Sequence, residues 1–234
     1  MANSVLIIGP SGTGKSTSIE KLDHKETFII KVKDKPLPFR GCNKKYKLAT
    51  KDNPEGNMIV LKSEDPSKRH SELKACLTRI NDGRPEIKNV IIDDFQYLMV
   101  DEYMSRCQEN GFGKFAEMGA NMWKVFDSLS LFRNDLNIVI ISHSQTDDDG
   151  ISTIKLIGKM VRNTVAPEGM FTVILHTVVQ DNKYKFLTQF RTIAGKELQA
   201  KSPKDMFEED FIDNDLNFVV DKMHEYYDFD DVDI

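Results

Sequence analysis

A glycine-rich segment near the start of the chain constrains the fold more than any other feature. Residues 4–17 read SVLIIGPSGTGKST, an apolar run followed by a glycine-rich turn and then by Lys-Ser. The pattern G-x-x-x-x-G-K-[ST] is complete, with Gly9, Gly14, Lys15 and Ser16 in its fixed positions. Glycines let successive backbone N–H groups surround phosphate oxygens, and the start of the following helix adds positive potential. The segment therefore predicts a strand, a phosphate-binding loop and a helix.

Side chains of this loop have distinct expected roles. Lys15 would reach the β- and γ-phosphates of a nucleotide, and the Ser16 hydroxyl would bind Mg²⁺. The loop thus predicts ATP and Mg²⁺ as cofactors. The residues expected to hold the nucleotide are Gly9, Pro10, Ser11, Gly12, Thr13, Gly14, Lys15, Ser16 and Thr17.

An apolar run that ends in two carboxylates predicts a second part of the same site. Residues 89–94 read NVIIDD, so a buried strand would end at Asp93 and Asp94. In P-loop proteins the Asp at the end of such a strand holds Mg²⁺. We expect Asp93 to bind the metal, usually through water. Asp94 is expected either to polarise the attacking water or to bond its neighbours.

Another apolar run, over residues 137–142, is followed directly by His143, Ser144 and Gln145. Ligands of parallel sheets bind at the carboxyl ends of the strands, so these polar side chains would lie near the γ-phosphate. We expect His143 or Gln145 to sense that phosphate.

Strand-like apolar runs alternate with helical patterns, which predicts an α/β fold with a mainly parallel central sheet flanked by helices. Expected strands are 5–8, 27–32, 58–61, 89–94 and 137–142, and expected helices are 15–22, 67–80, 95–107, 114–133 and 214–227. Two further runs, 171–179 and 184–190, predict a C-terminal antiparallel hairpin. Residues 151–164 are expected to be partly helical and residues 191–204 to form a loop.

The length and composition of the chain limit the classes of protein to which it can belong. With 234 residues, 40% hydrophobic and 29% charged, the chain has an ordinary soluble composition and suffices for one substantial core. No apolar run reaches the length of a membrane span, and no signal segment is expected. Cys42, Cys76 and Cys107 fit neither a disulfide framework nor a zinc site. These features predict a cytoplasmic protein without membrane contact.

Positive charge is concentrated after the second expected strand, although the net charge is −5. Residues 31–51 contain a single acid, Asp34, and interleave Phe39 and Tyr46 with basic side chains. Those basic residues are Lys31, Lys33, Lys35, Arg40, Lys44, Lys45, Lys47 and Lys51. Such a mixture suits single-stranded DNA, by phosphate neutralisation and base stacking. The alternative is a solvated surface whose two aromatic rings face the core.

The last part of the chain is acidic. Residues 205–234 carry many carboxylates and a single lysine, Lys222, and are expected to form a helix and tail after a P-loop domain over residues 1–204. Acidic segments of this kind are usually solvated, and sometimes dock partners. Aromatic and aliphatic residues alternate with the acids, so a protein partner could bind this tail.

These motifs together resemble the small RecA-core ATPases of bacteriophages, a group related to single-strand-annealing recombinases. Two short segments are similar to signatures of that group: Lys35-Pro36-Leu37-Pro38-Phe39 and Lys201-Ser202-Pro203-Lys204-Asp205-Met206-Phe207. The resemblance covers most of the chain. It implies a RecA-like sheet, a Mg²⁺-dependent ATPase stimulated by DNA, a homo-oligomer and, for a phage-encoded protein, the host cytoplasm.

The resemblance leaves the catalytic base open between two carboxylates. RecA-like proteins have a glutamate after the strand that follows the P-loop helix, and this chain has Asp34 there, between two lysines. The base is therefore expected to be Asp34 or Asp94. RecA-like filaments also use basic residues across the subunit interface, for which the candidates are Lys155, Lys159 and Arg162.

The expected function is an ATPase that acts on single-stranded DNA in recombination, annealing or replication. Two alternatives use the same loop. A nucleotide-gated interaction module would bind ATP with negligible turnover and dock a partner through the acidic tail. A kinase of nucleotides or small molecules usually has an arginine-rich lid, whereas the arginines of this chain are scattered singly.

Overall fold

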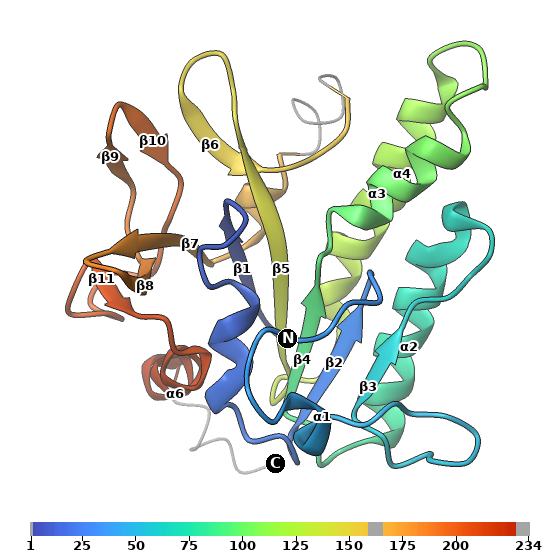
Figure 1. The fold of residues 1–234 in the computed structure, drawn as a ribbon, viewed down its shortest axis with the longest axis horizontal. Coiled ribbons are helices and arrows are strands. Elements are labelled where there is room, and N and C mark those ends of the chain that lie inside the picture. Colours follow the sequence, from blue (N-terminus) through green and yellow to red (C-terminus); the bar gives the residue numbers. More distant parts are fainter. Residues whose placement is uncertain (1, 159–165, 228–234) are drawn as a thin grey trace.

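A mostly parallel β-sheet forms the centre of the molecule (Figure 1). The computed structural model describes residues 2–158 and 166–227. Across the sheet the strand order is β11-β8-β7-β1-β5-β4-β2-β3. The strands are β1 (Asn3–Gly9), β2 (Thr27–Lys31), β3 (Met58–Val60), β4 (Asn89–Asp93), β5 (Asn137–Thr146), β7 (Val173–Gln180), β8 (Lys183–Leu187) and β11 (Phe211–Asp213). Strands from β7 to β3 run parallel, whereas β8 and β11 are antiparallel to their neighbours, which confirms the predicted α/β class.

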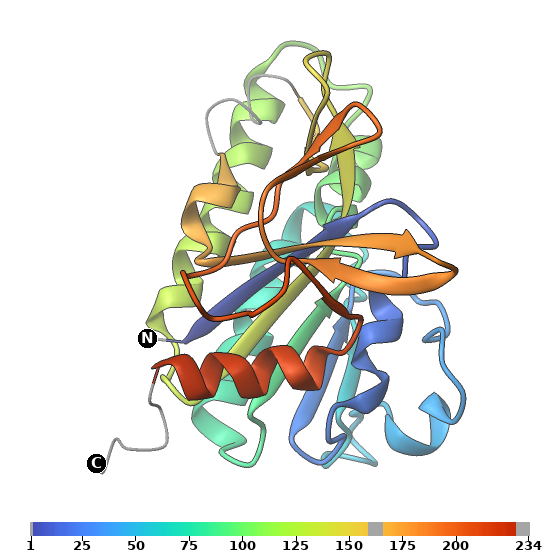
Figure 2. The ribbon, with the colours of Figure 1, turned by 90° about the vertical axis from the view of Figure 1, so that its left-hand side faces the viewer.

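One face of the sheet is covered by a short 3₁₀ helix and by the last helix. Val5 and Ile7 of β1 belong to a buried cluster that includes residues of η1 (Ser16–Lys21) and α6 (Leu216–Tyr227). In Figure 2, which looks onto this side, α6 lies in front of the sheet. The small helix α1 (Cys42–Lys45) contributes to the same cluster.

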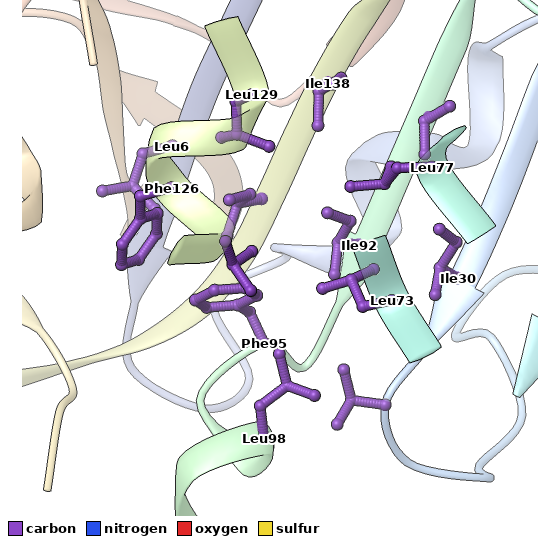
Figure 3. Packing of buried hydrophobic residues seen from close by; sticks show 14 of the residues in the cluster. Leu6, Ile30, Leu73, Leu77, Ile92, Phe95, Leu98, Phe126, Leu129 and Ile138 are labelled. Atoms are coloured by element: carbon purple, nitrogen blue, oxygen red, sulfur yellow. The ribbon is translucent and has the colours of Figure 1, made fainter. Parts of the chain in front are cut away.

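The other face is covered by three longer helices, α2 (Arg69–Gly83), α3 (Tyr97–Ser105) and α4 (Gly113–Ser128). Leu6 and Ile8, the alternate residues of β1, face this second cluster. Figure 3 shows the packing of this cluster. Its labelled side chains come from the sheet (Leu6, Ile30, Ile92, Ile138), from α2 (Leu73, Leu77) and from the region of α3, α4 and the short helix η3 (Leu129–Leu131), namely Phe95, Leu98, Phe126 and Leu129. Because both faces are buried, the strands are apolar throughout rather than alternating with polar residues.

A smaller sheet continues from the end of β5 and contradicts parts of two predictions. β5 continues past the main sheet and pairs with β6 (Ile151–Ile154), which pairs with β10 (Lys196–Leu198), and β10 pairs with β9 (Arg191–Ile193). Within the segment 151–164, expected to be partly helical, residues 151–154 form a strand, and within the expected loop 191–204 residues 191–193 and 196–198 form strands, so both predictions are wrong for these residues. Each of these strands is only three or four residues long, too short for an alternating pattern to mark it in the sequence. The remaining short helices are η2 (Pro66–Lys68) and η4 (Pro167–Met170).

The predicted C-terminal hairpin is present as β7 and β8. Its turn residues Asp181 and Asn182 have φ angles of 51° and 57°, a left-handed conformation that Asp and Asn tolerate in tight hairpin turns. After residue 204, β11 pairs with β8 and α6 packs on the sheet. The acidic tail over 228–234 lies outside the described residues. Among the helices that the structure describes, none combines the length and apolarity that crossing a membrane requires.

Buried His176 on β7 should make stability depend on pH. Its ring is 1% exposed, Nδ1 lies 3.2 Å from the Thr177 carbonyl oxygen and Nε2 lies 3.1 Å from Ser152 Oγ. Burial lowers the pKa of His176 to about 4. The unfolded chain takes up a proton near pH 6.5 and the folded chain does not, so stability is lost as the pH falls from about 6.5 towards 4. This residue alone should contribute a loss of about 3 kcal/mol.

Urea unfolding at pH 7 and at pH 5, followed by circular dichroism, tests the His176 prediction. The free energy of unfolding should fall less between these pH values in His176→Gln than in the native chain. Equal falls in both proteins would show that His176 does not carry the effect.

Candidate active site

A pocket of about 200 Å³ lies at the carboxyl ends of the central strands. Its lining residues are Ser11, Gly12, Gly14, Lys15, Ser16, Thr17, Lys35, Pro38, Asp94, His143 and Tyr184. The strand register brings these segments together, because Gly9 at the end of β1 is paired with His143 on β5. A larger hollow of about 480 Å³ lies beside β11 and α6, but it contains none of the predicted site residues. The smaller pocket is therefore the candidate site.

Two glycines of the loop, Gly9 and Gly14, are required by close contacts. A Cβ atom on Gly9 would lie 2.0 Å from Thr177 Oγ1, and one on Gly14 would lie 2.6 Å from Tyr184 Cγ. Gly14 also has φ of 91°, a conformation that L side chains rarely adopt. Thr13 is held from the same side, with its Oγ1 2.6 Å from Thr177 Oγ1. Neighbouring strands β7 and β8 thus set the shape of the phosphate-binding loop.

The two predicted metal ligands are adjacent. Ser16 Oγ donates a hydrogen bond of 2.7 Å to Asp93 Oδ1. The Asp93 carboxyl is buried, and burial, followed by the neighbouring Asp94 charge, raises its pKa. A buried carboxylate beside a hydroxyl is a pair of hard oxygen donors that suits Mg²⁺, whose charge would compensate the buried anion. The residues present therefore fit the metal that the sequence predicts.

Lys15 is bound to its own loop in this structure. Its Nζ donates hydrogen bonds to the carbonyl oxygens of Gly9, at 2.9 Å, and Pro10, at 2.5 Å. Burial lowers the pKa of Lys15 to about 8, although Asp93 and Asp94 partly oppose this shift. A phosphate placed in the loop would offer an anionic partner to this buried amine.

Asp94 is held in an unusual conformation at the other side of the pocket. Its φ is 62°, in the left-handed region where Asp and Asn are the tolerated non-glycine residues. Asp94 Oδ2 lies 2.5 Å from Lys35 Nζ, and Oδ1 lies 4.0 Å from His143 Nε2. Burial, followed by the charge of Lys15, lowers the pKa of His143. Asp94 is thus a buried carboxylate that faces the pocket, with a cation and a neutral imidazole beside it.

Asp34, the alternative base, lies elsewhere. Its side chain is 72% exposed, pairs with Lys31 at 3.1 Å and does not line the pocket. The next lysine, Lys33, binds Asp101 of α3 at 2.6 Å, so the loop after β2 directs Lys35 rather than Asp34 to the site. Of the two carboxylates left open by the sequence, the structure brings only Asp94 to the P-loop.

The last residues of β5 divide between the pocket and the smaller sheet. His143 lines the pocket, whereas Gln145 lies in the part of β5 that pairs with Thr153 of β6. A residue that sequence reasoning missed, Gln96, holds this segment. Its buried Oε1 accepts hydrogen bonds of 3.0 Å from the His143 backbone N–H and 3.3 Å from Ser142 Oγ. A lone Gln after two carboxylates gives no sequence signal of this role.

Three other lining residues, Lys35, Pro38 and Tyr184, were also missed as site residues. In the sequence, Lys35 and Pro38 belong to the basic stretch and Tyr184 to a hairpin strand, and none of them has a motif that marks a site. Of the proposed interface cations, Lys155 has an exposed side chain and its backbone N–H bonds to the His143 carbonyl at 2.8 Å. Lys159 and Arg162 lie outside the described residues.

In the basic stretch the two aromatic rings follow the alternative prediction, in which they face the core. Phe39 and Tyr46 are 9% and 2% exposed and pack edge-to-face at 6.2 Å, so their rings are part of the core and do not offer base stacking. Arg40, Lys44 and Lys51 are exposed and, among the described residues, have no side-chain partner. Of the two predicted kinds of DNA contact, the structure provides exposed cations for phosphate neutralisation and no exposed ring of Phe39 or Tyr46 for base stacking.

A comparison with protein-family models gives a match over most of the chain. The model of the AAA domain family matches residues 1–182, a stretch that contains the P-loop, Asp93, Asp94 and His143. No curated protein matches the chain.

Proposed function

We propose that this chain, which belongs to the AAA domain family, hydrolyses ATP and couples that cycle to single-stranded DNA. Membership of this family supports nucleotide binding and hydrolysis. The observation that carries the ATPase proposal is the hydrogen bond of 2.7 Å between Ser16 and Asp93, in a site that also holds Lys15 and Asp94.

Each residue of the pocket has a task in this proposal. The loop backbone binds the phosphates, and Lys15 leaves the Gly9 and Pro10 carbonyls to pair with phosphate oxygens. Ser16 and Asp93 would hold Mg²⁺, which supplies charge neutralisation at the phosphates when bound. Asp94 orients the attacking water and takes up its proton.

The reaction is an in-line displacement. The oxygen of water forms a bond to the γ-phosphorus as the bond from that phosphorus to the bridging oxygen breaks, which releases ADP and phosphate. Asp94 can serve only when its carboxylate is free to accept from water. The Lys35 ammonium lies 2.5 Å from Oδ2, which leaves Oδ1 to accept from water, and the γ-phosphate is an anion that would attract this ammonium away from Asp94.

Single-stranded DNA is proposed as the coupled ligand for two reasons. The chain resembles phage RecA-core ATPases of recombination, annealing and replication, and three exposed cations, Arg40, Lys44 and Lys51, suit phosphate contacts. The same connection between β2 and β3 carries Lys35, which pairs with Asp94. DNA bound to this connection would thereby change the pairing of Lys35 with the Asp94 carboxylate. We extend the proposal to a homo-oligomer and to partner docking by the acidic tail.

Measurement of ATP turnover with and without single-stranded DNA tests the coupling. We expect DNA to raise turnover, and higher salt to weaken DNA binding. The combined variant Arg40→Glu, Lys44→Glu and Lys51→Glu should lose this stimulation and keep basal turnover. A matched variant reverses three other exposed lysines, Lys124, Lys196 and Lys204, and should keep the stimulation.

The possible outcomes separate the candidate functions. If DNA changes neither turnover nor ATP affinity, and no complex forms at low salt, the DNA coupling is wrong and the ATPase remains. Tight ATP binding with negligible turnover would instead favour a nucleotide-gated interaction module. Transfer of phosphate to a nucleoside or nucleotide would favour a kinase.

A further inference from the structure

We propose that Tyr184 is the platform on which the nucleotide base stacks, which makes purine nucleoside triphosphates the favoured substrates. This inference rests on the proposed nucleotide site. It adds a residue beyond the segment that matches the family model, which ends at residue 182.

The position of Tyr184 against the P-loop is the first observation. Its side chain lies so close to Gly14 that a Cβ atom on Gly14 would be 2.6 Å from Tyr184 Cγ, 2.8 Å from its Cβ and 2.9 Å from its Cδ2. Tyr184 pairs with Val179 across the β7–β8 hairpin, whose tight turn immediately precedes β8. The ring is thus held beside the loop by a short, paired strand rather than by a long loop.

The order of the strands is the second observation. Asp94 follows β4 and His143 lies on β5, two strands on one side of β1. Tyr184 comes from β8, which lies beyond β7 on the other side. Figure 1 shows this arrangement, with β4 and β5 separated from β8 by β1 and β7. The γ-phosphate must lie towards Asp93 and Asp94, so the sugar and base extend towards the opposite side. Tyr184 lies on that side.

The exposure of Tyr184 distinguishes a ring that stacks on a nucleotide base from one that only packs against the loop. A ring that only covered Gly14 would be expected to be buried, but Tyr184 is 44% exposed and lines the pocket together with the P-loop. Phe190, after β8, is also exposed, at 53%, but does not line this pocket. An open aromatic face beside a phosphate site suits an aromatic base, and a purine offers more stacking area than a pyrimidine.

The test compares ligands with and without a base. Dissociation constants are measured by calorimetry with Mg²⁺ for ATP, GTP, CTP and inorganic tripolyphosphate. Tyr184→Ala should weaken ATP and GTP binding about tenfold and leave tripolyphosphate binding unchanged. Tyr184→Phe keeps the ring and should bind as the native chain does. The native chain should prefer ATP and GTP to CTP, and Tyr184→Ala should lose most of that preference.

A structural role for Tyr184 gives a different pattern. Equal weakening of ATP and tripolyphosphate would mean that the ring only supports the loop, and no change for either would mean that it does not contact the base. Either result overturns the inference. Phe190→Ala is the matched control and should bind every ligand normally. Absence of ATP binding and turnover in the native chain would instead contradict the proposed function itself.

Discussion

Replacement of Asp94 by Asn is expected to lower ATP turnover about 100-fold or more, with ATP affinity little changed. The change removes the carboxylate that would accept the proton of the attacking water, a contribution that typically amounts to about 100- to 10,000-fold. Asn has nearly the same shape and tolerates the φ of 62° found at this position, so the backbone should be retained. Initial rates at saturating ATP, together with calorimetric ATP binding, provide the measurement.

Asp34→Asn is the matched control for Asp94→Asn. Asp34 lies outside the pocket with a mostly exposed side chain, so its replacement should leave turnover within about twofold of the native rate. The opposite result, with turnover lost in Asp34→Asn and kept in Asp94→Asn, would assign the base to Asp34. That outcome would mean that the loop after β2 rearranges when nucleotide binds.

Lys15→Ala should weaken ATP binding and also lower turnover about 100- to 1000-fold. Removal of a preorganised positive group from a site of developing negative charge typically has an effect of this size. The amine is buried and bound to the Gly9 and Pro10 carbonyls, so it is already placed at the loop before the phosphates arrive. Because the pKa of Lys15 is lowered to about 8, bound phosphate should also raise it and cause proton uptake near pH 8.

Lys21→Ala is the control for loss of a lysine near the same loop. Lys21 lies at the end of η1, and its exposed ammonium pairs with Asp215 at 2.7 Å. Its loss should leave ATP binding and turnover unchanged. Proton uptake on ATP binding near pH 8, measured by calorimetry in buffers of different ionisation enthalpy, should be smaller in Lys15→Ala. If Lys15→Ala binds and hydrolyses ATP normally, the phosphate site is not at this loop.

Much of the fold follows from local sequence patterns. The apolar runs of β1, β4 and β5 are buried on both faces, and such runs are visible without knowledge of their partners. The strands β6, β9 and β10 were missed because each is only three or four residues long, and because β6 and β10 pair with each other from distant parts of the chain. Phe39 and Tyr46 were ambiguous for a similar reason, since composition does not reveal which way a ring points.

The phosphate-binding loop was predictable from the sequence alone, because its glycines, lysine and serine lie within a few residues of one another in a recognisable pattern. The pairing of Ser16 with Asp93 was also predictable from a strand that ends in a carboxylate. Only the tertiary structure decided which other groups complete the site. Asp94 rather than Asp34, the support of His143 by Gln96, and the placement of Tyr184 on Gly14 all depend on strand order and register. Contacts of this kind join segments far apart in the chain, and no local pattern encodes them.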